Sequence, residues 1–273
     1  MPTFVNHAQM LTLLTEEFSA LADLSAGLTE TQWDTPTCLP GWTVRDNLSH
    51  MIGTESMLLQ LPAPTVEAAT GEHVKNPIGQ ANEVWVESMR QRPGSELVAR
   101  FVDVTGQRTA ALASMTQAEF DAPSWTPAGP DETYGRFMRI RHFDCFLHEH
   151  DMRAALGMAD RPTPSHVESA LTEVATGLGF IVGKRAGMPT GSRVRIELSG
   201  TVERVFLISV DGRAAVVDEL NGEPTVVLRM PAMLFLRLTG GREDPGPHIG
   251  SDLQLGGDHA LAATLANHLA FTV

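Results

Sequence analysis

The chain has 273 residues, of which 42% are hydrophobic, and this length is comfortable for two compact domains. Its formal net charge of −13 predicts no nucleic-acid partner, because phosphate backbones repel an acidic surface. No apolar stretch approaches the roughly 18 residues of a membrane span, and residues 1–18 lack the basic start of a signal peptide. The sequence therefore predicts a soluble cytoplasmic protein with no membrane partner, and it does not indicate an oligomeric state.

Apolar residues recur at helical spacing through the first two thirds of the chain. The predicted helices cover residues 4–28, 43–62, 79–92, 95–115, 133–157 and 165–182. Thr43 is the expected N-cap of the second helix, with Asp46 as its capping-box partner, and Gly157 is the expected end of the fifth. Segments 31–42, 62–79 and 121–133, rich in proline and polar residues, are predicted loops.

The pattern changes near residue 190 to β-branched and alternating segments. The predicted strands are 193–198, 202–210, 213–219 and 225–230, separated by Ser-Gly, Asp-Gly and Asn-Gly pairs that are typical of hairpins. Two further helices are predicted at 230–241 and 257–271. The expected architecture is α and α+β: a helical bundle over residues 1–184, a boundary between about 184 and 191, and a small α+β domain over 190–273.

The helix predicted at 133–157 contains the most informative polar residues. Successive helical residues turn by about 100°, so Asp144, His148 and Asp151 fall on one narrow face. Asp144 and His148 are one turn apart, about 6 Å along the axis, and can converge on a single ion. A third ligand should come from another helix, and His50 is the best candidate because an unpaired imidazole in a buried helix is costly. Three protein ligands would leave the ion partly open, with Asp151 as a supporting or substrate-binding group.

A simpler interpretation of the same residues is also open. An Asp–His pair at this spacing is commonly a surface hydrogen bond, and a mid-helix histidine is commonly a hydrogen-bonded core residue. Cys38 and Cys145 are too few for a disulfide framework and are predicted to be reduced thiols. Cys145 points about 100° away from the ligand face, so it is not counted as a ligand.

Three stretches of the sequence resemble the family of mycothiol-dependent maleylpyruvate isomerases. They are CLPGWTVRDNLSHMIGTE, FDCFLHEHDMRAALG and GGDHALAATLANHLA, which together extend the resemblance over nearly the whole chain. The resemblance implies a DinB-like up-down four-helix bundle followed by a sterol-carrier-like α+β domain. It also implies a divalent metal, zinc, held by His50, Asp144 and His148, although the acidic ligand of the family is often glutamate.

The resemblance further implies an enzyme whose cosubstrate is the thiol mycothiol. The family isomerase adds the thiolate to a double bond, lets the resulting single bond rotate and expels the thiol, and related chains are thought to act as thiol S-transferases on electrophiles. An arginine of the C-terminal domain is implied in catalysis, where it would bind the substrate carboxylate, and Arg242 and Arg237 are the candidates. Together with Asp151 of the helical bundle, they are the predicted catalytic residues. Two other classes stay open: a metal-dependent hydrolase on the same bundle, which would use metal-activated water, and a non-catalytic small-ligand-binding protein.

Overall fold

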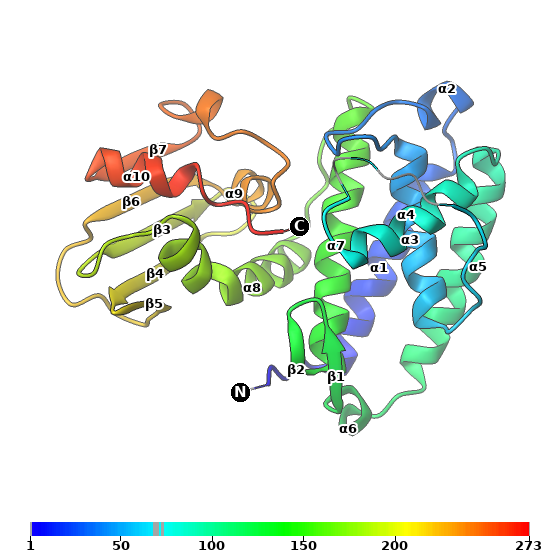
Figure 1. The fold of residues 1–273 in the computed structure, drawn as a ribbon, viewed down its shortest axis with the longest axis horizontal. Coiled ribbons are helices and arrows are strands. Elements are labelled where there is room, and N and C mark those ends of the chain that lie inside the picture. Colours follow the sequence, from blue (N-terminus) through cyan, green and yellow to red (C-terminus); the bar gives the residue numbers. More distant parts are fainter. Residues whose placement is uncertain (1, 68–70, 72–73, 273) are drawn as a thin grey trace. The chain divides into compact units, whose positions relative to one another are not determined.

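The computed structural model describes residues 2–67, 71 and 74–272 of the chain (Figure 1). It divides into two compact units, Met1–Asp160 and Arg161–Val273, and each is described by itself. The first unit is helical apart from one small hairpin, and the second combines a sheet with helices. Among the described residues, none of the helices is both long and apolar enough to cross a membrane.

Four long helices form the first unit: α1 (His7–Ser25), α3 (Val44–Leu58), α5 (Gly94–Ala113) and α7 (Tyr134–Ala155). Helices α1 and α3 each lie against both α5 and α7, so the four enclose one core (Figure 1). Each helix contributes the apolar face that its spacing predicted. Fully buried side chains of this core include Leu14, Leu21, Leu48, Met51, Phe101 and Met138. The predicted helical bundle is confirmed.

Shorter elements connect the long helices. They are α2 (Glu30–Trp33), α4 (Pro77–Met89), α6 (Gln117–Phe120), β1 (Pro123–Thr126) and β2 (Gly129–Thr133). The prediction of a loop over 121–133 is wrong, because β1 and β2 form an antiparallel hairpin. Prolines are tolerated there since each strand of a two-stranded sheet has a free edge, where a missing N–H is harmless. Part of the loop predicted at 62–79, namely residues 68–70 and 72–73, lies outside the described residues.

The second unit is built on a five-stranded sheet with the order β5-β4-β3-β6-β7. Its strands are β3 (Arg193–Ser199), β4 (Arg204–Asp211), β5 (Arg213–Val216), β6 (Val226–Pro231) and β7 (Gln254–Gly257). Its helices are α8 (Pro164–Phe180), the π-helical turn η1 (Ile181–Arg185), α9 (Ala232–Thr239), the 3-10 turn η2 (Gly246–His248) and α10 (His259–Ala266). In β3, Val194, Ile196 and Leu198 are buried while the residues between them are not, so one face of the sheet forms the core.

The boundary predicted at 184–191 differs from the division between Asp160 and Arg161. Helix α8 belongs to the second unit because it packs on the sheet: Glu168 forms a 2.6 Å ion pair with Arg204 of β4, and Gly179 lies directly against the backbone of Ala214 in β5. Helical periodicity identifies an apolar face but does not say which core will cover it.

A second difference concerns the Asn221-Gly222 pair, which predicted a hairpin between the last two predicted strands. The Ser-Gly and Asp-Gly pairs do join antiparallel neighbours, β3 with β4 and β4 with β5. The strand after Asn221-Gly222, however, is β6, which pairs in parallel with β3 and antiparallel with β7. The short strand β7 was not predicted, because its sequence QLGG has little β-branched or aromatic character.

Gly94, the first residue of α5, is expected to tolerate no larger side chain. A Cβ at this position would lie 1.8 Å from Nε1 of Trp33, which is only 1% exposed. We expect Gly94→Ala to lower the free energy of unfolding of the helical unit by about 1–3 kcal/mol through overpacking. Urea denaturation followed by tryptophan fluorescence would measure this, because all four tryptophans lie in this unit.

Gly106→Ala in the middle of the same helix is the matched control. Nothing lies within 4 Å of a Cβ there, and Gly106 is exposed. Alanine should therefore stabilise the helix by about 0.5–1 kcal/mol. Equal effects of the two substitutions would contradict the packing argument.

Candidate metal centre

The side chains of His50, Asp144 and His148 converge between helices α3 and α7. Each offers one ligand atom, and these atoms all lie within 4.8 Å of one another. Nε2 of His50 lies 3.1 Å from Oδ2 of Asp144, and Nε2 of His148 lies 3.4 Å from Oδ1. The two imidazoles are buried, whereas the Asp144 side chain is 31% exposed, so the cluster opens to solvent on the side of the carboxylate. The three residues predicted to share one ion are therefore brought together.

Local sequence positions both helices. The Thr43 side chain accepts the backbone N–H of Asp46, and the Asp46 side chain accepts the backbone N–H of Thr43, so the predicted capping box begins α3 as expected. Thr133 caps α7 through the N–H of Arg136. With both helices begun at these residues, helical periodicity turns His50 toward α7, and Asp144 and His148 toward α3.

The loop before α3 places an indole against both imidazoles. Pro40 and Gly41 form a tight turn in which the Trp42 N–H donates to the Leu39 carbonyl at 3.1 Å. Gly41 has φ +80°, as the third position of a type II turn requires. The Trp42 ring centroid lies 5.2 Å from that of His50 and 5.9 Å from that of His148.

The Trp42 indole is itself held in place. Its N–H donates to Oε1 of Glu83 at 2.6 Å, and Glu83, on α4, is buried. The sequence predicted only a loop over residues 31–42 and did not indicate that Trp42 contacts the cluster. The arrangement gives the cluster an aromatic wall.

Two acceptors orient the ring of His148. Its Nδ1 lies 2.8 Å from Oδ1 of Asn47 and 3.3 Å from Oδ2 of Asp151. A proton on Nδ1 would donate to these oxygens and leave the Nε2 lone pair directed toward Asp144. Asn47 was not predicted, although its position three residues before His50 places it on the same helical face. Asp151, predicted as a supporting or substrate-binding group, contacts this ring, and its role remains a prediction.

The charges of the cluster shift its pKa values. Burial by itself would raise the pKa of the Asp144 carboxyl, but the charges of His148 and Arg141 hold it well below its usual range. Burial opposes protonation of His148 too, yet Asp144 and Asp151 raise its pKa. For His50 burial dominates and lowers the pKa, which favours the neutral imidazole that binds metals.

This donor set fits a divalent metal. Zinc binds imidazole nitrogens and carboxylate oxygens, and one such atom from each of the three residues lies within 4.8 Å of the others. Ligand histidines usually donate their other ring N–H to a neighbour, as His148 would with a proton on Nδ1. Among the described residues, the buried Nδ1 of His50 has no hydrogen-bond partner. The residues therefore suit zinc chemistry, and their assignment as ligands remains a prediction.

The two cysteines contact residues that neighbour the cluster, namely Asp151 and Arg141. Cys38 is exposed, and its thiol lies 3.3 Å from Oδ1 of Asp151, whereas Cys145 is buried beside Arg141. Arg237 and Arg242 belong to the second unit, where Arg237 pairs with Glu243 at 3.0 Å and Arg242 donates to the Gly240 carbonyl. The roles predicted for these two arginines remain predictions.

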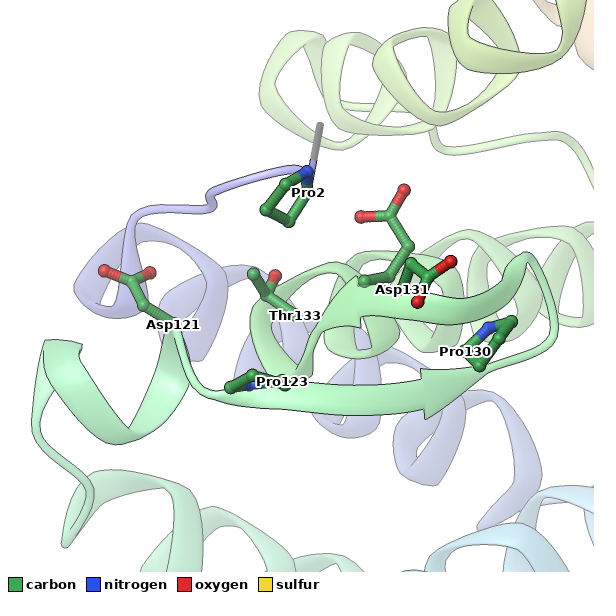
Figure 2. A pocket seen from close by; sticks show the side chains of 7 residues that line it. Pro2, Asp121, Pro123, Pro130, Asp131 and Thr133 are labelled. Carbon is green, nitrogen blue, oxygen red and sulfur yellow. The ribbon is translucent and has the colours of Figure 1, made fainter.

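A pocket of about 270 Å³ lies at a different place in the helical unit, beside the β1–β2 hairpin. Figure 2 shows Pro2 over this hairpin, with Asp121, Asp131 and Thr133 around it. Its described lining residues include no histidine or cysteine. Glu132, also in the lining, accepts the Thr3 N–H at 2.8 Å and pairs with Arg136, so the hollow forms where the N-terminal segment is tied to the hairpin. The convergent donors between α3 and α7 are the stronger candidate for chemistry.

The fold and the donor cluster define a class of two-unit proteins. The N-terminal helical unit contains a candidate metal centre, and an α+β unit follows it along the chain. Residues 14–153 match the family model of the mycothiol maleylpyruvate isomerase N-terminal domain, and residues 168–264 match that of the MDMPI C-terminal domain. The chain belongs to the mycothiol-dependent maleylpyruvate isomerase family, as its sequence motifs indicated.

Two similar solved structures are of the mycothiol-dependent maleylpyruvate isomerase, one of them with a histidine replaced by alanine. Each is 15% identical to this chain and covers 94% of it and 96% of its own chain, with TM-scores of 0.61 and 0.56. At this identity the likeness shows a shared fold. No curated protein matches the chain.

Proposed function

We propose that this chain is a metal-dependent enzyme that uses a low-molecular-weight thiol, mycothiol, as cosubstrate. Its reaction would be an isomerisation or an S-transfer on an electrophilic small molecule. The observation that carries the proposal is the convergence of His50, Asp144 and His148 at a point where the carboxylate is partly exposed. The family of the chain and the names of its solved relatives support the thiol.

The residues around the cluster prepare it for a cation. Asn47 and Asp151 hold the His148 ring so that Nε2 faces Asp144, and burial lowers the pKa of His50, which favours its neutral form. The Trp42 ring packs against both imidazoles, which are buried. The exposed side of Asp144 is then the approach for a small molecule. Carboxylate and imidazole donors suit zinc, which we propose as the metal.

The metal, when bound, would stabilise the thiolate form of the thiol, which is the nucleophile and is scarce at neutral pH for a group of pKa about 8.5. We further propose that Asp151 has a supporting role through His148. Arg237 or Arg242 would bind a substrate carboxylate, because a guanidinium can donate two parallel hydrogen bonds to it.

A thiol-dependence assay tests the proposal. Zinc-loaded protein is incubated with maleylpyruvate and a panel of electrophiles, with mycothiol or with S-methyl mycothiol. The methylated compound keeps the sugar scaffold but has no ionisable thiol. We expect turnover only with the free thiol, and loss of turnover after a chelator removes the metal. The trans isomer would identify an isomerase, and a mycothiol conjugate would identify an S-transferase.

Different outcomes support the rival functions. Metal-dependent turnover that is indifferent to the thiol would indicate hydrolysis by metal-activated water. No turnover, together with a lipid found on the purified protein by native mass spectrometry, would indicate a binding protein.

A further inference from the structure

A buried line of alternating charges leads from the core of the helical unit to Asp144. Nε of Arg108 donates to Oε2 of Glu55 at 3.0 Å. The other oxygen, Oε1, accepts from Nε and Nη2 of Arg141 at 3.1 and 2.9 Å, and Nη1 of Arg141 donates to Oδ2 of Asp144. We name these residues, Arg108, Glu55, Arg141 and Asp144, the charge line.

The charge line is buried except at its last member. The side chains of Arg108, Glu55 and Arg141 are 3%, 2% and 5% exposed, against 31% for Asp144. Because taking charges out of water is costly, a guanidinium at this depth needs the acceptors that Glu55 and Asp144 supply. The line therefore has a fixed end in the core and an open end at the candidate metal centre.

The guanidinium of Arg141 has a direction that its partners set. Two of its nitrogens are engaged by one oxygen of Glu55, and the group is planar, so Nη1 can point only along the remaining direction, toward Asp144. Glu55 is held in turn by Arg108, whose Nη2 also contacts the Tyr134 hydroxyl at 3.0 Å. Lysine could not reproduce this arrangement, since an ammonium is a point charge without a rigid fork.

The direction of the Arg141 guanidinium matters for Asp144 because the χ2 torsion of an aspartate has only a weak preference of its own. Oδ2 is shared by His50 and Arg141, while Oδ1 faces His148. A hydrogen bond from a fixed guanidinium to Oδ2 restricts rotation of the carboxylate, so that each oxygen stays opposite one imidazole.

We infer that Arg141, held by Glu55, is a positioning residue that fixes the Asp144 carboxylate for metal binding. This inference rests on the metal centre of the proposed function. It gives the three donors their convergence before an ion arrives, with the guanidinium balancing the negative charge of the carboxylate.

The test measures zinc affinity by competition with a chromophoric chelator, and the absorption spectrum of the cobalt-substituted protein, which reports coordination geometry. Arg141→Met should weaken zinc binding by about 10–100-fold, the usual cost of losing a partner of a metal ligand. Arg141→Lys should lose less, because it keeps the charge. Glu55→Gln should also weaken binding and change the cobalt spectrum, although it does not touch Asp144.

Arg153→Met is the matched control. Arg153 lies on the same helix, is 7% exposed, and pairs with buried Glu149 at 2.6 Å. Within the described part of the chain it forms no hydrogen bond or ion pair with the predicted ligands. It should leave zinc affinity and the cobalt spectrum unchanged, even if it lowers stability.

Wild-type affinity and spectrum in all Arg141 and Glu55 variants would overturn the inference. If Arg141→Met does not fold, the zinc affinity and the cobalt spectrum of Arg141→Lys and Glu55→Gln test the inference instead. A wild-type chain that binds neither zinc nor cobalt would overturn the metal centre itself, which distinguishes failure of the proposed function from failure of the positioning role.

Discussion

Replacing His148 with alanine is expected to remove most of the bound zinc. The substitution deletes one of three predicted ligands and leaves Asn47 and Asp151 without the ring that they orient. Because losing only an outer partner of a ligand costs about 10–100-fold in affinity, losing the ligand should cost more than about 100-fold. Elemental analysis of desalted protein and a competition titration would measure the loss.

Thermal unfolding gives an independent readout of the same variant. A ligand that binds only the folded state stabilises it by about 2.7 kcal/mol at 100 times its Kd. Zinc should therefore raise the Tm of the wild type and have little effect on His148→Ala. His150→Ala is the control, since His150 is a buried histidine of the same helix whose Nδ1 lies 2.8 Å from the Phe146 carbonyl. Equal zinc content in wild type and His148→Ala would end the ligand assignment.

Replacing Glu55 with alanine is expected to destabilise the helical unit severely. Glu55 is 2% exposed and is the shared partner of Arg108 and Arg141, so its loss leaves two guanidiniums in the core with fewer acceptors. Breaking a buried ion pair from one side costs about 3–5 kcal/mol, a large part of the 5–15 kcal/mol by which domains are typically stable. Urea denaturation monitored by tryptophan fluorescence would show the shift.

Glu96→Ala is the control for this prediction. Glu96 pairs with Arg92 on the surface, where the two side chains are 47% and 44% exposed. Water screens such a pair, so its loss should cost no more than about 1 kcal/mol. If Glu55→Ala were equally mild, the buried pairs would contribute little to the stability of the unit.

Sequence spacing was a good guide to the helices and to the candidate ligands. Asp144 and His148 share a face because they are one turn apart, and this holds wherever the helix packs. His50 could be proposed because a histidine inside an apolar helix needs a partner. The cap at Thr43 and Asp46 was equally readable, since it depends on residues three apart.

The partners of these residues could not be read in the same way. Arg141 precedes Asp144 by one turn, but its other partner, Glu55, is 86 residues away in the sequence. Asn47 is 101 residues from the imidazole that it orients. Which polar side chains meet across a core depends on how the helices pack, and a single sequence carries no periodic signal for that.

The sequence by itself determined the elements whose causes are local: the long helices, their caps, the alternating strands and the polar face of α7. Only the tertiary structure decided that α8 covers the sheet, that β6 runs parallel to β3, and that Arg141 is held between Glu55 and Asp144. The physical reason is the range of the interactions. Periodicity and capping act within a few residues, whereas burial, strand order and charge pairing are settled between segments that only folding brings into contact.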